Sequence, residues 1–144
     1  MIDEYENVED LLATTDPQSP VYCVYPHVYR KSTQHFLNGF PGRVLYAVKA
    51  NNSPAVIEQI YDAGVRHFDC ASLPEIKLVA ELCPDSTIYF MNPVRLDKDA
   101  RIAQQEYGVR HFIVDHHSGL APLLNEIDPQ RSVVGQGYFQ RHAA

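Results

Sequence analysis

The stretch RVLYAVKANNSPAVIEQIYDAGVRHFDCASLPEIKLVAELCP, residues 43–84, contains two apolar runs, each followed by a segment with helical spacing. The runs RVLYAV (43–48) and VRHFDC (65–70) begin 22 residues apart, at positions 43 and 65. A strand followed by a helix at this interval predicts successive βα units, in which the crossovers are right-handed and the strands are parallel.

Both helical segments have recognisable ends. Ser53 can cap the first helix, Pro54 suits its first position, and Gly64 can close it in a left-handed conformation. Ser72 and Glu75 are spaced as a capping box at the start of the second helix. Each helix has an apolar stripe, formed by Val56, Ile57, Ile60 and Ala63 in the first and by Ile76, Val79, Ala80 and Cys83 in the second.

The same alternation extends along the whole chain. From residue 43 onward the apolar runs begin 21 to 23 residues apart, which favours a (β/α) barrel over an open Rossmann sheet. A leucine-rich repeat has a similar period, but its L-x-x-L-x-L pattern is absent. About five units are present where eight close a barrel, so we expect an α/β fold, a partial (β/α)8 TIM-type barrel with parallel strands. The further expected strands are 21–25, 87–91, 110–115 and 131–134, and the further expected helices are 27–40, 97–108 and 118–128.

Composition limits the classes of function. The 144 residues suit one domain, and the net charge of −6 with scattered basic residues gives no footprint for nucleic acid or an acidic membrane. The start MIDEYENVEDLL is acidic, and no apolar run is long enough to span a bilayer, so we expect a cytoplasmic protein. The spacing of Cys23, Cys70 and Cys83 and of the seven histidines predicts reduced, mostly packed thiols and no metal site.

Lys49 follows the strand 43–48 directly. Alternation sends Leu45, Ala47 and Lys49 to one face, and in a barrel the carboxyl end of a strand opens toward the active-site face. Burial there disfavours the charged form of an amine, and a neutral amine can attack a carbonyl, as a Schiff-base lysine does. The alternative is a lysine that simply extends into solvent.

Asp69 stands at the equivalent end of the next strand, twenty residues after Lys49. Adjacent parallel strands bring the two ends together, so the Asp69 carboxylate can pair with the lysine or contact a cofactor. It can equally cap a helix or form a surface ion pair. Ser72 and Glu75 have the same two interpretations, as site residues or as capping residues alone.

Residues 46–79, YAVKANNSPAVIEQIYDAGVRHFDCASLPEIKLV, resemble the pyridoxal-phosphate decarboxylases that include ornithine decarboxylase and have an alanine-racemase-like barrel. The lysine strand, the twenty-residue interval and the F-D-C-A-S-x-x-E-I motif all coincide. The resemblance implies that Lys49 binds pyridoxal phosphate covalently. It further implies that Asp69 and Glu75 lie at the cofactor site and that Ala47 is the small residue beside the cofactor.

The resemblance covers roughly residues 19–127. The pair Asn92-Pro93 is more similar to the ornithine or lysine branch of the family than to the diaminopimelate branch. Arg95 departs from the pattern, because many members have lysine there. The implied reaction is decarboxylation of ornithine or lysine to a diamine, a step of polyamine biosynthesis, by an enzyme whose full-length relatives are homodimers.

Full-length relatives are much longer, so we expect residues 19–134 to be the N-terminal part of the barrel, 1–18 a leader segment and 135–144 an atypical tail. In this tail we expect Gly135, Gln136 and Gly137 to interrupt the last strand. On this interpretation the isolated chain binds pyridoxal phosphate weakly or not at all and is inactive. Two alternatives are a non-catalytic relative that binds regulators and an unrelated, complete open-sheet α/β domain.

Overall fold

The computed structural model describes residues 3–136 and contains one five-stranded sheet in the order β1-β2-β3-β4-β5. All four neighbouring pairs of strands are parallel, which confirms the predicted partial (β/α) barrel. The strands are β1 (Tyr46–Ala47), β2 (His67–Cys70), β3 (Thr87–Phe90), β4 (His111–Val114) and β5 (Val133–Gln136).

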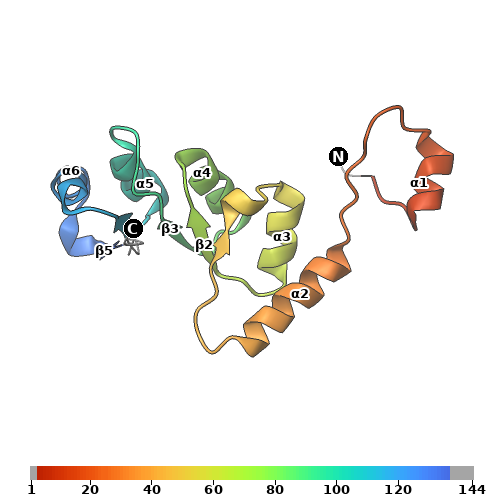
Figure 1. The fold of residues 1–144 in the computed structure, drawn as a ribbon, viewed down its shortest axis with the longest axis horizontal. Helices are drawn as coiled ribbons and strands as arrows, with labels where there is room; N and C mark the ends of the chain where they lie inside the picture. Colours follow the sequence, from red (N-terminus) through yellow and green to blue (C-terminus); the bar gives the residue numbers. More distant parts are fainter. Residues whose placement is uncertain (1–2, 137–144) are drawn as a thin grey trace, which may run out of the picture.

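The helices follow one another across the molecule in chain order (Figure 1). Four of them, α3 to α6, each connect two neighbouring strands, as the βα period predicts. Helix α1 has no buried residue and lies away from the sheet, beyond α2. The helices are α1 (Val8–Thr15), α2 (Pro26–Gly39), α3 (Pro54–Asp62), α4 (Leu73–Leu82), α5 (Asp99–Tyr107) and α6 (Leu120–Glu126), with 3-10 turns η1 (Val48–Ala50), η2 (His117–Gly119) and η3 (Pro129–Arg131).

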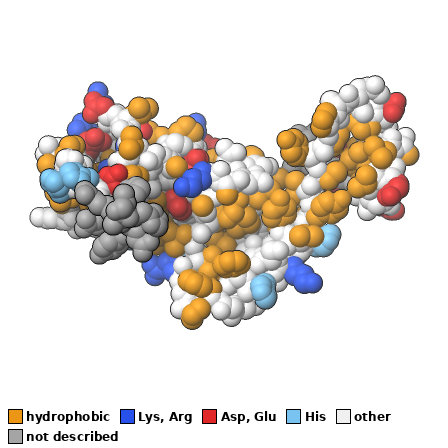
Figure 2. All heavy atoms as spheres, in the orientation of Figure 1, with side chains coloured by type: hydrophobic (Ala, Val, Ile, Leu, Met, Phe, Trp, Pro, Cys, Tyr) orange, Lys and Arg blue, Asp and Glu red, His pale blue; other side chains and the backbone are white. Residues whose placement is uncertain are grey.

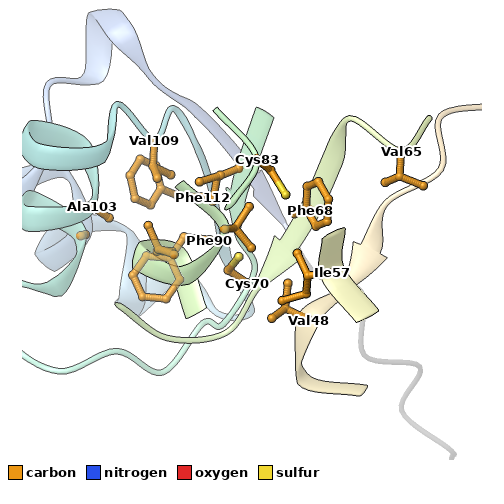
Figure 3. Close-up of a cluster of buried hydrophobic side chains, with 14 of the residues drawn as sticks. Val48, Ile57, Val65, Phe68, Cys70, Cys83, Phe90, Ala103, Val109 and Phe112 are labelled. Atoms are coloured by element: carbon orange, nitrogen blue, oxygen red, sulfur yellow. The ribbon is translucent and has the colours of Figure 1, made fainter. Parts of the chain in front are cut away.

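The hydrophobic core lies between one face of the sheet and the connecting helices. Phe68, Phe90 and Phe112 come from three adjacent strands and are fully buried together with helical side chains such as Ile57 (Figure 3). Alternation along the strands sends the intervening residues to the opposite face. Of the predicted helical stripes, all members are buried except Ala80, which is partly buried against the core.

The three thiols are free, and Cys70 and Cys83 are buried whereas Cys23 is exposed. Burial raises the pKa of Cys83 to about 11 and also raises the pKa of Cys70. Within residues 3–136, no helix has both the length and the hydropathy that a membrane crossing requires.

Helix α2 packs against α3 but has no buried residue of its own. Hydrophobic side chains gather along α2 on the face that Figure 2 shows. Val28 and Phe36 are 50% and 62% exposed, and a cavity of about 330 Å³ lies between this helix, β1 and α3. One side of the helix therefore presents apolar surface to solvent.

Residues 21–25 do not form the predicted strand. Tyr22 is 97% exposed, and among residues 3–136 no strand lies beside β1 on its outer side. A β-branched and aromatic run becomes a strand only where a neighbouring strand can pair with it. The run here is flanked by Pro20 and Pro26, and Pro26 begins α2.

The first and last strands also differ from their predicted ranges. The expected strand 43–48 is reduced to Tyr46–Ala47, and the chain then turns into η1, so Lys49 lies in a 3-10 turn. At the other edge, Gly135 and Gln136 do not interrupt β5 but pair with β4, because a ladder uses backbone groups that glycine also has. Residues 137–144 of the expected tail lie outside the described part of the chain.

Candidate active site

Lys49 sits in the loop that leaves the carboxyl end of β1. The Tyr46 hydroxyl donates a hydrogen bond to the Asn51 carbonyl oxygen at 2.9 Å, which closes this loop. Asn51 Oδ1 in turn accepts a hydrogen bond from the Ser53 backbone N–H at 3.0 Å, and Ser53 makes no side-chain cap. The asparagine after the lysine, rather than the predicted cap Ser53, therefore organises the entry into α3.

The Lys49 side chain is exposed. The expectation that the strand end would shield its amine from water is therefore wrong for the described structure. The physical reason is the position of β1, which is an edge strand with β2 on one side and no described strand on the other.

Asp69 is half-buried on β2 and pairs in register with Ala47 on β1. Because the strands are parallel, this pairing places the loop of Lys49 and the carboxylate of Asp69 together at the carboxyl ends of β1 and β2. Burial raises the pKa of Asp69, the Lys49 ammonium opposes that rise, and the Glu75 carboxylate adds to it. The charges of Lys49 and Glu75 therefore act on Asp69, although the ion pair that forms within residues 3–136 is Lys77 with Glu81 and not Lys49 with Asp69.

Glu75 lies in the first turn of α4 and is held by the backbone that leaves β2. Its Oε2 accepts a hydrogen bond from the Ala71 N–H at 2.8 Å. Ser72 is the N-cap residue, but its side chain makes no capping hydrogen bond, so the predicted capping box is wrong. Glu75 reaches one residue further back than a capping box requires, and this fixes its carboxylate close to Asp69.

The loop that follows β3 carries two residues whose roles the sequence did not reveal. Asn92 Nδ2 donates to the Ala71 carbonyl oxygen at 3.1 Å. Arg95 Nη1 donates to the carbonyl oxygens of Asn92 at 2.6 Å and Ile113 at 2.8 Å. The available signal was the position of Asn92-Pro93 immediately after an apolar run, where a side-chain amide can bond to the end of a neighbouring strand.

A second polar cluster, formed by Arg43, His67, Tyr89 and His111, was also missed and lies toward the amino-terminal ends of the strands. The Tyr89 hydroxyl lies 3.3 Å from Arg43 Nη1 and 3.3 Å from His67 Nδ1, and its ring stacks on His111 at 4.3 Å between centroids. Burial lowers the pKa of both histidines, and Arg43 lowers both further. Arg43, His67 and His111 lie at or before the start of their strands, whereas Lys49 follows the end of β1.

The described residues form a parallel sheet of βα units with a lysine after its first strand and a carboxylate on its second, which is the arrangement expected from the resemblance to the pyridoxal-phosphate decarboxylases. Residues 27–134 match the family model described as "Pyridoxal-dependent decarboxylase, pyridoxal binding domain", and the chain belongs to this family. The match overturns the alternative of an unrelated open-sheet domain.

Two curated relatives are similar over different shares of the chain. A lysine/ornithine decarboxylase of Selenomonas ruminantium is 41% identical over 87 residues, which are 58% of this chain and 21% of that protein. Antizyme inhibitor 2 of Homo sapiens is 32% identical over 124 residues, 78% of this chain and 26% of the relative. The chain thus spans about a quarter of the length of these relatives.

Solved structures show the same fold. The arginine decarboxylase of Paramecium bursaria Chlorella virus, bound to agmatine, superposes with a TM-score of 0.79 at 24% identity, over 90% of this chain and 34% of the other. The lysine decarboxylase of Selenomonas ruminantium, in complex with PLP and cadaverine, gives 0.78 at 21% identity, over 98% and 37%. These likenesses support the barrel architecture.

Proposed function

We propose that this chain supplies the cofactor-bearing lysine of a pyridoxal-phosphate-dependent decarboxylase that acts on ornithine or lysine. The observation that carries the proposal is the placement of Lys49 and the half-buried Asp69 at the carboxyl ends of two neighbouring parallel strands. Membership of the family supports the cofactor, and the lysine/ornithine decarboxylase relative supports the substrate class. Homodimerisation and a cytoplasmic location stay predictions.

The residues at this edge fit the aldehyde end of pyridoxal phosphate. A primary amine is the group that condenses with an aldehyde, and Lys49 presents one. Ala47, two residues before it on β1, has a small side chain, and Asp69 lies beside Ala47 in register. Lys49 would hold the cofactor, with Asp69 and Glu75 providing negative charge beside it.

When bound, pyridoxal phosphate acts as an electron sink for the bond that breaks at the α-carbon of an amino acid. The Lys49 amine must lose a proton before it can act as a nucleophile. The raised pKa of Asp69 gives its carboxylate a greater affinity for a proton, so Asp69 is suited to hold one close to the amine. Glu75 maintains that property, because its charge is among the causes of the raised pKa.

The test is reduction of a mixture of the chain and pyridoxal phosphate with borohydride, followed by peptide mass spectrometry. We expect the pyridoxyl adduct at Lys49 in excess over Lys31, Lys77 and Lys98. Because Lys49 is exposed, we expect the adduct of these 144 residues alone to be weak and exchangeable before reduction. Lys77→Ala, which alters an exposed lysine of α4, is the control, and labelling spread equally over all lysines would contradict the proposal.

A second candidate function is binding of a regulatory protein without chemistry. The likeness to antizyme inhibitor 2 favours it, because that likeness extends over more of the chain than the likeness to the decarboxylase does. Purified antizyme is the probe. A stable complex formed equally by the wild-type chain and Lys49→Ala, with no adduct at Lys49, would favour this function over the enzymatic one.

A further inference from the structure

We infer that Arg95 is a positioning residue that joins the carboxyl ends of β3 and β4 and, through Asn92, holds the end of β2 on which Asp69 stands. The inference rests on the proposed function, because it concerns the same edge of the sheet. It assigns a role to the residue at which the sequence departs from the family pattern.

The hydrogen bonds of Arg95 are with backbone and not with acidic side chains, and its guanidinium also lies over the Phe90 ring, 5.8 Å from the ring centroid. One nitrogen, Nη1, donates to two carbonyl oxygens, of Asn92 at 2.6 Å and of Ile113 at 2.8 Å. Within residues 3–136 the ion pair that forms is Lys77 with Glu81, and Arg95 takes no part in it. Burial lowers the pKa of the half-buried Arg95 guanidinium, and the charges of Glu126, Asp115 and Asp99 oppose that shift. The groups that bind the guanidinium directly are the two backbone carbonyls.

Arg95 acts where the backbone ladder stops. The last register pair between β3 and β4 is Phe90 with Phe112, and the bond to the Ile113 carbonyl joins the strands one residue further on. A hydrogen bond with a charged donor is stronger than a bond between neutral groups. The guanidinium thus extends the connection between these two strands beyond their regular pairing.

Asn92 links Arg95 to the end of β2 by two hydrogen bonds. Its carbonyl oxygen accepts from Arg95, and its own Nδ2 donates to the Ala71 carbonyl oxygen. Ala71 is two residues beyond Asp69, and its N–H is bound by Glu75. Loss of the Arg95 donors would therefore loosen the segment between Asp69 and Glu75, although Arg95 touches neither carboxylate.

Two substitutions distinguish the effect of the Arg95 hydrogen-bond donors from the effect of its side-chain volume. Arg95→Met keeps a long side chain without donors, whereas Arg95→Lys keeps a charged nitrogen with three donors that can serve both carbonyl oxygens. Arg101→Met, at an exposed position of α5, is the matched control. All variants are compared in the full chain at a temperature where circular dichroism shows equal folding.

The primary measurement is amide hydrogen exchange by NMR. The N–H groups of Ala71 and Met91, which are bonded at the edge of the sheet, should exchange about tenfold faster in Arg95→Met, while that of Phe68 inside β2 should not change. Arg95→Lys should restore protection to within about threefold of wild type. Unchanged exchange at Ala71 and Met91, or equal acceleration at Phe68, would overturn the inference.

Adduct formation provides the second readout. The apparent affinity for pyridoxal phosphate, measured by borohydride trapping at Lys49, should fall severalfold in Arg95→Met and recover in Arg95→Lys. If the wild-type chain formed no adduct at Lys49, the proposed function would fail while the exchange result still decided the role of Arg95. If adduct formation were normal and the exchange pattern unchanged, the proposed function would stand and this inference would fail.

Discussion

The cluster around Tyr89 shows how neighbouring cations change the titration of single residues. His67 and His111 lie on either side of Tyr89. Besides burial, the charges of Arg43 and His111 lower the pKa of His67, and those of Arg43 and Arg110 lower the pKa of His111. Burial and these cations all favour the neutral imidazole. Each histidine therefore takes up its proton at a lower pH in the folded chain than its ordinary value of 6.5.

This difference predicts how stability depends on pH. Below about pH 6.5 the unfolded chain binds more protons at these two histidines than the folded chain does, so the free energy of unfolding should fall as pH falls from 7 toward 5. Urea unfolding at a series of pH values measures the slope. In Arg43→Gln the slope should be shallower because one cation is removed. Arg101→Gln should leave it unchanged, and an equal slope in all three chains would contradict the assignment.

At the scale of elements, the helix that follows β2 depends on its buried stripe. Ile76 of α4 is fully buried in the core, whereas Leu96 in the loop before α5 is 77% exposed. Ile76→Val should lower the free energy of unfolding by about 0.5–1.5 kcal/mol, because it removes a packed methylene. Leu96→Val is the control and should change it by less than about 0.5 kcal/mol. Equal changes in the free energy of urea unfolding would show that burial of the α4 stripe does not stabilise the fold.

The elements that the sequence predicted well are those whose pattern repeats. The period of the apolar runs gave the parallel order of strands, and the stripes gave the buried face of α3 and α4. Residues 21–25 failed because strand propensity is realised only against a partner strand. The predicted caps at Ser53 and Ser72 are absent, because neither side chain makes a capping hydrogen bond. The side chains that bind backbone N–H groups before these two helices are Asn51, which binds Ser53, and Glu75, which binds Ala71.

The candidate site was predictable in position but not in environment. Twenty residues between Lys49 and Asp69 sufficed to place them at one edge, because parallel neighbours align their carboxyl ends. The exposure of Lys49 depends on whether another strand covers the outer side of β1, and this is a property of the tertiary structure that the local sequence does not show. The bonds of Asn92 and Arg95 join segments about twenty residues apart, so no short window of sequence contains both partners.

At the scale of the whole molecule, the sheet of residues 3–136 has two edges, formed by β1 and β5. An edge strand offers unpaired backbone groups to another chain, and α2 adds exposed apolar surface beside β1. We therefore expect these 144 residues to associate as their concentration rises. Such association would be a property of the open sheet, separate from the homodimer expected of full-length relatives.

Sedimentation velocity over a range of concentrations tests this expectation. Val133 begins β5 and is 59% exposed, and a lysine on an edge strand opposes pairing through its charge and hydration. Val133→Lys should therefore shift the distribution toward the monomer. Val94→Lys introduces the same charge in an exposed loop and should have little effect. A wild-type chain that stays monomeric at every concentration would contradict the expectation.

The unequal burial of the three thiols has a practical consequence. Alkylating reagents attack the thiolate, and burial keeps Cys70 and Cys83 protonated and out of reach, whereas Cys23 is exposed just before α2. A maleimide dye added to the native chain would consequently mark one position without any engineering. Loss of that selectivity during heating or denaturation would report, residue by residue, when the layer beneath Asp69 opens to solvent.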